Sequence, residues 1–256
     1  MNGTIAFVKK EWMEHIRTYK FLIMAIIFII FGIMSPLFAK LMPEVLKSMS
    51  GVNGISLIEI PTPTAIDSYT QFFKNVTQMG LIVLLLVFSG LLSQEISKGT
   101  LIPLLTKGLS RTSVILAKYF VALCIWTICY YGAFLITFLY TIFLFPSMIV
   151  HHLFISVLCA WLFGAFLLAL FLFASSVGRG NYGGLLLSVL FIGLLFILNL
   201  IPNVAQYSPL TLISVNVEML KPAYILSDIF CSFIITIVSS FVLLFSSVLV
   251  FKKKKL

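Results

Sequence analysis

Residues 93–119 read SQEISKGTLIPLLTKGLSRTSVILAKY and interrupt a chain that is otherwise very apolar. The charged residues of this stretch are one acid and four cations: Glu95, Lys98, Lys107, Arg111 and Lys118. Long apolar runs without charge flank it on both sides. A compact cationic segment between two such runs predicts a connection at a membrane surface that joins two membrane-spanning helices.

The composition of the 256-residue chain also predicts a membrane protein. Hydrophobic residues make up 61% of it and charged residues only 10%, whereas soluble domains carry about 25% charged residues. Polar groups are therefore too few to cover a water-exposed surface. The net charge of +9 would suggest nucleic acid for a soluble protein. Cytoplasmic loops of membrane proteins accumulate Lys and Arg, however, so we predict no nucleic-acid partner.

Six apolar segments are long enough for helical spans, because a crossing needs about 20 apolar residues. They are residues 21–39, 74–93, 114–144, 153–177, 183–201 and 225–251. The predicted fold class is therefore an all-α membrane protein, with a six-helix transmembrane domain over 21–251. Outside the spans, we expect a longer outer loop over 40–73 and short helices at the outer rim over 202–224.

The distribution of charge predicts the orientation. Of the 17 Lys and Arg residues, all but four lie on the side of the two termini. The four on the opposite side are Lys40, Lys47, Lys74 and Lys221. Both termini and residues 94–118 are therefore predicted to be cytoplasmic. We interpret the basic tail over 252–256 as the last inner anchor rather than a retrieval signal, and we expect a multi-pass protein of a bacterial plasma membrane.

The first twenty residues predict an amphipathic helix that lies on the inner leaflet. Apolar residues recur there at spacings of three and four, which is one face of a helix: Ile5, Val8, Trp12, Ile16 and Tyr19. Charged residues line another face, at distances that allow pairing: Lys10, Glu14 and Arg17. Over 1–20 we therefore expect a cytoplasmic interfacial helix, with Trp12, Ile16, Arg17 and Tyr19 at the membrane surface.

The opening stretch is longer than a simple turn requires. Leu101, Leu104 and Leu105 can form a short apolar helix face, and Pro103 suits a first helical turn. Gly99 and Gly108 allow sharp reversals on either side, and Ser110 is placed as the N-cap of the third span. A small surface helix offered to another protein explains both the cations and this punctuation, with Lys107 and Arg111 facing phosphates or an acidic partner.

At these residues the chain resembles the membrane subunits of type 2 ATP-binding cassette (ABC) transporters. In that family an interfacial helix precedes six spans, and the loop between spans two and three carries Glu, then Gly-Thr, then Ser-Arg. The matching residues here are Glu95, Lys98, Gly99, Thr100, Ser110, Arg111 and Lys118. Residues 207–210, Tyr-Ser-Pro-Leu, are similar to the family's segment before the last span. The family often has Pro before Ser-Arg, whereas this chain has Gly108-Leu109.

The resemblance implies a permease subunit that pairs with a second permease, identical or related, to form the pathway. Cytoplasmic ATPase subunits would dock on the loop. We assign ATPase coupling to Glu95, Lys98, Gly99, Thr100, Leu101, Leu104, Leu105, Lys107 and Arg111. The chain has no GxxxxGK[ST] motif, so we expect no catalytic residue and no cofactor here, with ATP and Mg²⁺ bound by the partner ATPase. A pathway without charge favours export of a hydrophobic or amphipathic cargo, such as a peptide, antibiotic or lipid.

Three alternatives are less well supported by the sequence. An intramembrane enzyme needs ionisable residues at mid-depth, and the predicted spans carry no Asp, Glu or His there. An ion-coupled secondary transporter or channel, acting without an ATPase, usually keeps a buried carboxylate or broken helices. The third alternative is a path for a soft metal ion lined by cysteines. The four cysteines lie in apolar runs without CxxC spacing, so we predict neither a disulfide nor a metal site.

Overall fold

The computed structural model describes residues 2–53, 62–145, 150–178, 180, 182–222, 224 and 226–254. Within these ranges every regular element is a helix. Arg179 and Lys255, two of the cations on the side of the termini, lie outside the described residues. The prediction of an all-helical chain is confirmed for the described part.

The elements follow one another as a series of long helices separated by short ones. They are α1 (Asn2–Arg17), α2 (Lys20–Asn53), α3 (Ala65–Asn75), the π-helical turn η1 (Val76–Gly80), α4 (Leu81–Phe88), α5 (Ser93–Ser97), α6 (Ile102–Thr106), α7 (Arg111–Leu144), α8 (Leu153–Val177), α9 (Gly183–Asn199), α10 (Pro202–Ala205), α11 (Thr211–Ser214), the 3₁₀ turn η2 (Glu218–Leu220) and α12 (Ser227–Lys253).

Five helical segments of the described chain are long and apolar enough to cross a membrane. They are Lys20–Val45, Ala65–Ser97, Arg111–Leu144, Leu153–Val177 and Ile229–Lys253. The remaining predicted span, 183–201, corresponds to α9, which has 17 residues. At 1.5 Å per residue α9 is about 25 Å long, slightly less than the roughly 30 Å of a typical hydrocarbon core.

The predicted outer loop over 40–73 is wrong for most of its described length, because α2 continues to Asn53 and α3 begins at Ala65. A capping box starts α3, in which Thr64 and Asp67 exchange hydrogen bonds. Polar side chains in and beside α3 pair inside the bundle. Ser68 lies 2.6 Å from the Thr141 hydroxyl, and the Asn75 amide donates to the Ser35 hydroxyl at 3.0 Å.

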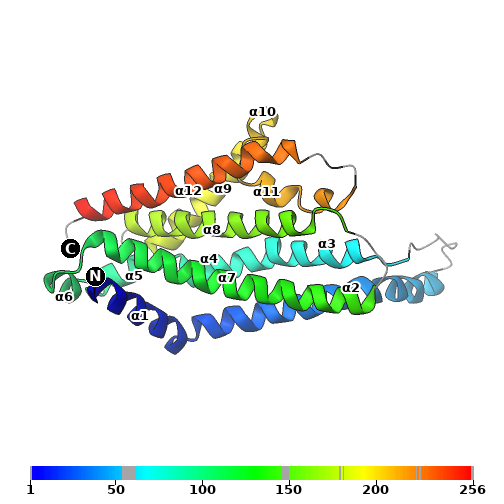
Figure 1. Ribbon diagram of the computed structural model, residues 1–256, viewed down its shortest axis with the longest axis horizontal. Coiled ribbons are helices and arrows are strands. Elements are labelled where there is room, and N and C mark those ends of the chain that lie inside the picture. Colours follow the sequence, from blue (N-terminus) through cyan, green and yellow to red (C-terminus); the bar gives the residue numbers. More distant parts are fainter. Residues whose placement is uncertain are drawn as a thin grey trace.

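Helix α8 forms the centre of the bundle, between α12 and α7 (Figure 1). Its contact with α7 is close because Gly164 faces the fully buried ring of Trp126, and any Cβ at position 164 would overlap that ring. The Trp126 indole N–H donates to the carbonyl of Trp161 at 3.0 Å. The helices α10, α11 and η2 confirm that short helices occupy residues 202–224, and Leu212, Met219 and Leu220 are buried there.

Both termini lie at one end of the bundle, together with α5 and α6 (Figure 1). The Thr4 hydroxyl of α1 donates to the Ser113 hydroxyl of α7 at 3.2 Å, and Arg111 of α7 contacts the end of α12. We call this the terminal end. The later part of α2 and the start of α3 lie toward the opposite end (Figure 1).

Candidate functional site

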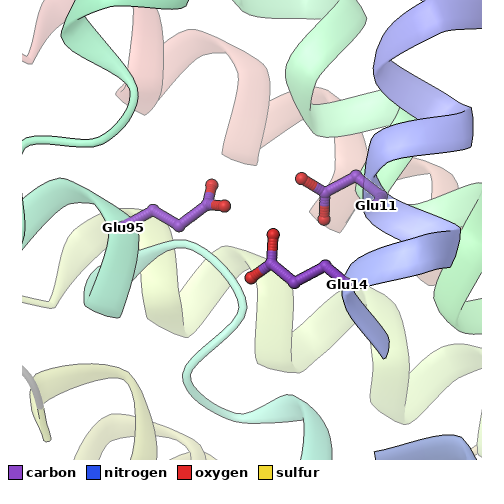
Figure 2. Close-up of side chains that lie close together, drawn as sticks. All are labelled: Glu11, Glu14 and Glu95. Atoms are coloured by element: carbon purple, nitrogen blue, oxygen red, sulfur yellow. The ribbon is translucent and has the colours of Figure 1, made fainter. Parts of the chain in front are cut away.

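Three carboxylates from distant parts of the chain converge at the terminal end. Glu11 and Glu14 project from α1, and Glu95 projects toward them from α5 (Figure 2). One oxygen of each lies within 4.8 Å of the others. Like charges this close disfavour one another's ionised form, so the cluster requires cations in direct contact.

Two lysines supply these cations. The Lys10 ammonium lies 2.6 Å from Glu14, 2.7 Å from Glu95 and 3.0 Å from Glu11. The Lys118 ammonium, from α7, lies 2.8 Å from both Glu11 and Glu95. Lys10, Glu11, Lys118 and Glu95 therefore form a closed ring of alternating charge. We call this ring, together with Glu14, the Glu95 ion network.

The ring is buried on the side of Lys118 and reaches solvent on the side of Lys10. The side chains of Lys118 and Glu11 are each 2% exposed, whereas that of Lys10 is 40% exposed. Burial disfavours the charge on Lys10, but hydrogen bonds to Glu14 and Glu95 outweigh it and raise the pKa of Lys10. Lys10 therefore stays charged, and the network joins α1, α5 and α7 through charged contacts.

Carboxylates grouped in this way also offer the oxygen donors that a divalent cation takes. Here, however, the Lys10 ammonium contacts all three, and the Lys118 ammonium contacts two of them. The oxygens already have cationic partners on two sides. The residues present therefore fit an internal ion network better than a metal centre.

His15 lies one turn beyond Glu11 on α1 and is 3% exposed. Its ring packs against Phe88, with 5.6 Å between ring centroids, and its Nδ1 has no hydrogen-bond partner. Burial, and after it the charges of Lys20 and Lys118, lower the pKa of His15 to about 4. His15 is therefore neutral at pH 7.

This pKa predicts a loss of stability in mild acid. Between pH 6.5 and about 4 the unfolded chain binds a proton at His15 that the folded chain does not, so stability falls as pH falls through this window. A shift of this size corresponds to roughly 3 kcal/mol. Unfolding in detergent, followed by tryptophan fluorescence from pH 7 to pH 4, measures the loss. His15→Leu should remove most of the pH dependence and His151→Leu, at an exposed position, should not; equal slopes in all three proteins would contradict the assignment.

The segment between α4 and α7 has the predicted turns and caps. Gly99 and Gly108 both have positive φ, +67° and +90°, and α6 lies between them with Pro103 in its first turn. Ser110 caps α7, because its hydroxyl accepts from the backbone N–H of Ser113 at 3.0 Å. Thr100 donates its backbone N–H to the Glu95 carbonyl at 3.1 Å. This bond holds the chain after α5 close to the residue that enters the ion network.

The predicted coupling residues divide into anchored and exposed groups. Leu101 is buried, while Leu104 and Leu105 pack against the core with part of their surface. Lys98, Thr100 and Lys107 are exposed at the terminal end. The structure thus brings the predicted set together in one place, and its contact with an ATPase stays a prediction.

Arg111 has a different position from the one expected. Its guanidinium donates to the carbonyls of Phe251, Lys252 and Lys254 at 2.7, 2.9 and 2.7 Å, and it lies over the Phe251 ring. The Lys254 ammonium in turn donates to the carbonyls of Ser176 and Gly178 at 2.9 and 2.8 Å. Arg111 and Lys254 therefore satisfy carbonyls at the C-terminal ends of α12 and α8, and we call this arrangement the C-terminal clasp.

Arg111→Met should loosen the end of α12. The substitution keeps an apolar stem but removes the donors to three carbonyls, a loss of about 1–3 kcal/mol. Hydrogen exchange of the amides over 247–254 should become faster, since the last turn opens more often. Lys107→Met, four residues earlier and exposed, serves as the control and should leave that exchange unchanged. Protection equal to wild type in Arg111→Met would show that the clasp contributes nothing.

Two faces of α1 were predicted, but a third, buried face was missed. Ile5 and Ile16, on the predicted apolar face, are exposed, and so is Arg17. Tyr19 is exposed as well but lies beyond α1, which ends at Arg17 and not at residue 20. Trp12 is half-buried and its ring lies 6.2 Å from that of Phe21. The buried face holds residues spaced four apart: Phe7, Glu11 and His15.

The sequence analysis did not identify Glu11 and Lys118 as partners. The Lys118 ammonium, within the third predicted span, is buried between Glu11 and Glu95. A detectable signal was the four-residue spacing of Phe7, Glu11 and His15, which places an acid in the middle of a mostly apolar stripe. The matching signal was Lys118, a charged residue inside the third apolar run, because an ionisable residue within a span needs a partner of opposite charge.

The long apolar helices packed around α8, with the ion pairs of Glu11, Glu95 and Lys118 at the terminal end, define a multi-pass helical membrane protein. Comparison with protein families gives the particular group. Residues 5–256 match the model described as ABC-2 family transporter protein, so the chain belongs to this family. Members are membrane components of ABC transporters and not the ATPase itself. No curated protein matches the chain.

Proposed function

We propose that the chain is the permease subunit of an ABC transporter, which forms the transmembrane pathway as a dimer with a second permease. Separate cytoplasmic ATPase subunits bind ATP and Mg²⁺ and drive it. Membership of the ABC-2 family over nearly the whole chain supports this proposal. The observation that carries it is the Glu95 ion network, which joins the surface element α5–α6 to α1 and to the spanning helix α7.

The proposal includes six spans, with α9 as the fifth. The end of α8 lies at the terminal end, because Ser176 and Gly178 accept from Lys254. Helix α12 also finishes there, so its start lies at the opposite end. The chain must therefore cross the bundle between α8 and α12, and α9 is the described element long enough to do so. Six crossings would leave both termini on one side of the membrane, and the positive charge of that side supports a cytoplasmic location.

ATP-driven closure of the ATPase subunits would then act on the terminal end. A displacement of α6 would be transmitted to α5 through the buried Leu101 and the turn at Gly99. From α5 it would be transmitted to α1 and α7 through the ion pairs of Glu95 with Lys10 and Lys118. Because α5, α1 and α7 share one buried ring of charge, they would move together rather than singly. The consequence is a rigid-body tilt of the spans relative to the second permease.

The cargo we propose is hydrophobic or amphipathic, moved outward. A groove of about 650 Å³ lies between α9 and α12 above α8. Its walls are apolar, with Phe166, Phe191 and Leu195 among them, and Ser239 is its polar side chain. Such a surface suits an acyl chain, an apolar peptide or a hydrophobic antibiotic better than an ion or a sugar.

Co-purification followed by transport tests the proposal. The chain, expressed from its own locus with an affinity tag, should be recovered with an ATPase subunit, and the complex should hydrolyse ATP after reconstitution. Uptake of a fluorescent phospholipid or hydrophobic peptide into inverted vesicles should require ATP. Glu95→Lys should separate hydrolysis from transport while the chain still inserts. Transport by the chain alone, driven by a proton or sodium gradient, would favour the ion-coupled alternative and overturn the proposal.

A further inference from the structure

The second membrane-spanning segment carries polar side chains further into the membrane than the sequence predicted. Its start was expected at residue 74, but the segment runs from Ala65 to Ser97. Inside it lie Gln, Lys and Asn side chains at helical spacing: Gln71, Lys74, Asn75 and Gln78. Asn75 is satisfied within the bundle, since its amide donates to Ser35 and its Oδ1 accepts from Gln71. Lys74 and Gln78 are exposed.

The packing of the bundle places Gln78 near the middle of the membrane. A Cβ on Gly80 would lie 3.1 Å from the Phe28 ring, and that ring meets the Trp126 ring edge-on at 5.6 Å. Trp126 in turn covers Gly164, which lies near the middle of the spanning helix α8. Gln78 is two residues from Gly80, or about 3 Å along the helix axis.

Neither the Gln78 nor the Lys74 side chain has a partner in the part of the chain that the structure describes. Lys74 is six residues from Gly80, about 9 Å nearer the opposite end. It is therefore within the roughly 15 Å that separate the middle of the hydrocarbon core from its edge. The long Lys74 side chain can extend to that edge, whereas that of Gln78 is too short. Because an unpaired amide in hydrocarbon is costly, this face of the segment borders water or protein rather than lipid.

The same face of the segment changes from polar to apolar along its length. Exposed residues follow one another at four-residue spacing, which places them on one side of a helix: Lys74, Gln78, Ile82 and Leu86. Asp67, the acid closest to Lys74 in this segment, instead accepts from the backbone N–H and the hydroxyl of Thr64 at the cap of α3. A molecule lying along this face would therefore meet a cation and an amide with one half and apolar side chains with the other.

We propose that the cargo is an amphipathic anion, a phosphate or carboxylate joined to an apolar chain, and that it passes along this face. Its acidic group pairs with Lys74, the Gln78 amide bonds to a polar oxygen beside that group, and the apolar chain lies along Ile82 and Leu86. This inference rests on the proposed function and narrows the cargo that it names. Charge complementarity carries it, because Lys74 is the charged side chain that this face holds within the membrane. A membrane lipid and a free amphiphile share this chemistry.

The first measurement is the access of water to this face. The full-length chain, with the ATPase subunit that co-purifies with it, is placed in phosphatidylcholine nanodiscs after its four cysteines are replaced by alanine. Gln78→Cys should react with a water-soluble methanethiosulfonate at least about tenfold faster than Ile128→Cys, because the reactive thiolate forms in water and not in hydrocarbon. Ile128 is the matched control, since it is two residues from Trp126 on α7 and is 51% exposed.

The second measurement is the sign of the charge at this face. Rates for an anionic sulfonatoethyl reagent and a cationic trimethylammonioethyl reagent are each divided by the rate with free cysteine. At Gln78→Cys the anion should be favoured by at least about threefold, since Lys74 lies about 6 Å away at helical spacing. Lys74→Gln should abolish this preference. Lys40→Gln, the same change at an exposed position of α2, should alter it by less than about 1.5-fold.

The third measurement uses the chain with its own cysteines, so it does not depend on folding of the cysteine-free protein. Dodecyl phosphate should stimulate ATP hydrolysis by the complex at a concentration about tenfold or more below that of dodecyltrimethylammonium, and Lys74→Glu should reverse this order. Stimulation by phosphatidylglycerol in the nanodisc but not by dodecyl phosphate would support a membrane lipid as the anion. The opposite result would support a free amphiphile.

The possible results separate this inference from the proposed function. If no ATPase subunit is recovered with the wild-type chain, the proposed function fails. If the complex transports cargo but Gln78→Cys reacts no faster than Ile128→Cys, this face does not border the pathway. A spontaneous disulfide between two copies of Gln78→Cys that excludes both reagents would assign the face to contact between permeases. Equal rates for the two reagents, or equal stimulation by the two dodecyl amphiphiles, would exclude selection of an anion. Any of these last three results overturns the inference alone.

Discussion

Lys118→Met will lower the free energy of unfolding by about 3–5 kcal/mol, because it removes one partner from a buried ion network. Glu11 and Glu95 would each lose a contact of 2.8 Å, and three carboxylates would then share Lys10 alone. Chemical unfolding in detergent micelles measures the change. If the Glu95 ion network couples α5 to α7, ATP-dependent transport should be lost as well.

A second substitution distinguishes lost charge from lost packing. Glu11→Gln combined with Lys118→Met removes one charge of each sign, so the double variant should recover more than half of the stability lost in Lys118→Met. Lys98→Met changes the same residue type at an exposed position of the same end, and it should stay within about 0.5 kcal/mol of wild type. A Lys118→Met protein as stable as wild type would remove the physical basis of the network.

Trp126→Ala should cost a similar amount, about 3–5 kcal/mol, since it empties the largest fully buried side chain of the described core. The Trp126 ring stacks on Tyr130 with 5.0 Å between centroids and meets the Phe28 ring edge-on at 5.6 Å. Its loss also leaves the Trp161 carbonyl without its indole donor. Thermal unfolding in detergent measures the effect, and Phe143→Ala, on the same helix but 78% exposed, is the control.

The effect of Gly164→Ala on stability should differ between the wild-type chain and the Trp126→Ala variant. In the wild-type chain Gly164→Ala should destabilise by about 1–3 kcal/mol, because the added methyl overlaps the Trp126 ring. In the Trp126→Ala background the methyl enters free space, and the same substitution should be neutral or stabilising. Gly132→Ala, where a Cβ meets no atom within 4 Å, should be tolerated in both. Equal costs of Gly164→Ala in both backgrounds would contradict the close approach of α7 and α8.

The sequence predicted those features of the fold that depend on local chemistry. Apolar runs located α7 and α8 nearly to the residue, and glycine and serine positions located the turns around α6. Prediction of spans from apolar runs was less reliable where polar side chains pair inside the bundle. Residues 65–73 were predicted as part of a loop, yet they are helical in α3, where the Ser68 hydroxyl contacts the Thr141 hydroxyl; just beyond them the Asn75 amide donates to the Ser35 hydroxyl. Hydropathy counts a polar residue as solvated and cannot include a partner 40 or more residues away.

For the candidate site, too, the sequence identified individual residues but not their tertiary contacts. Glu95 and its neighbours were identified from a resemblance, but their partners were not, because ion pairing across α1, α5 and α7 depends on tertiary packing. Arg111 illustrates the limit. Its position before the third span was correct, whereas the direction of its guanidinium depends on where α12 ends, which no local pattern specifies.

The junction between α1 and α2 gives the ion network a further role. Tyr19 has a φ of +58°, and a non-glycine residue in this left-handed region costs roughly 1–2 kcal/mol. Local backbone preference therefore favours a straight continuation of α2 into α1, and distant contacts hold the elbow bent. The Glu95 ion network is one such restraint. If the ring opened, one restraint on this conformation would be lost, and the backbone preference of Tyr19 would favour a different angle between α1 and α2.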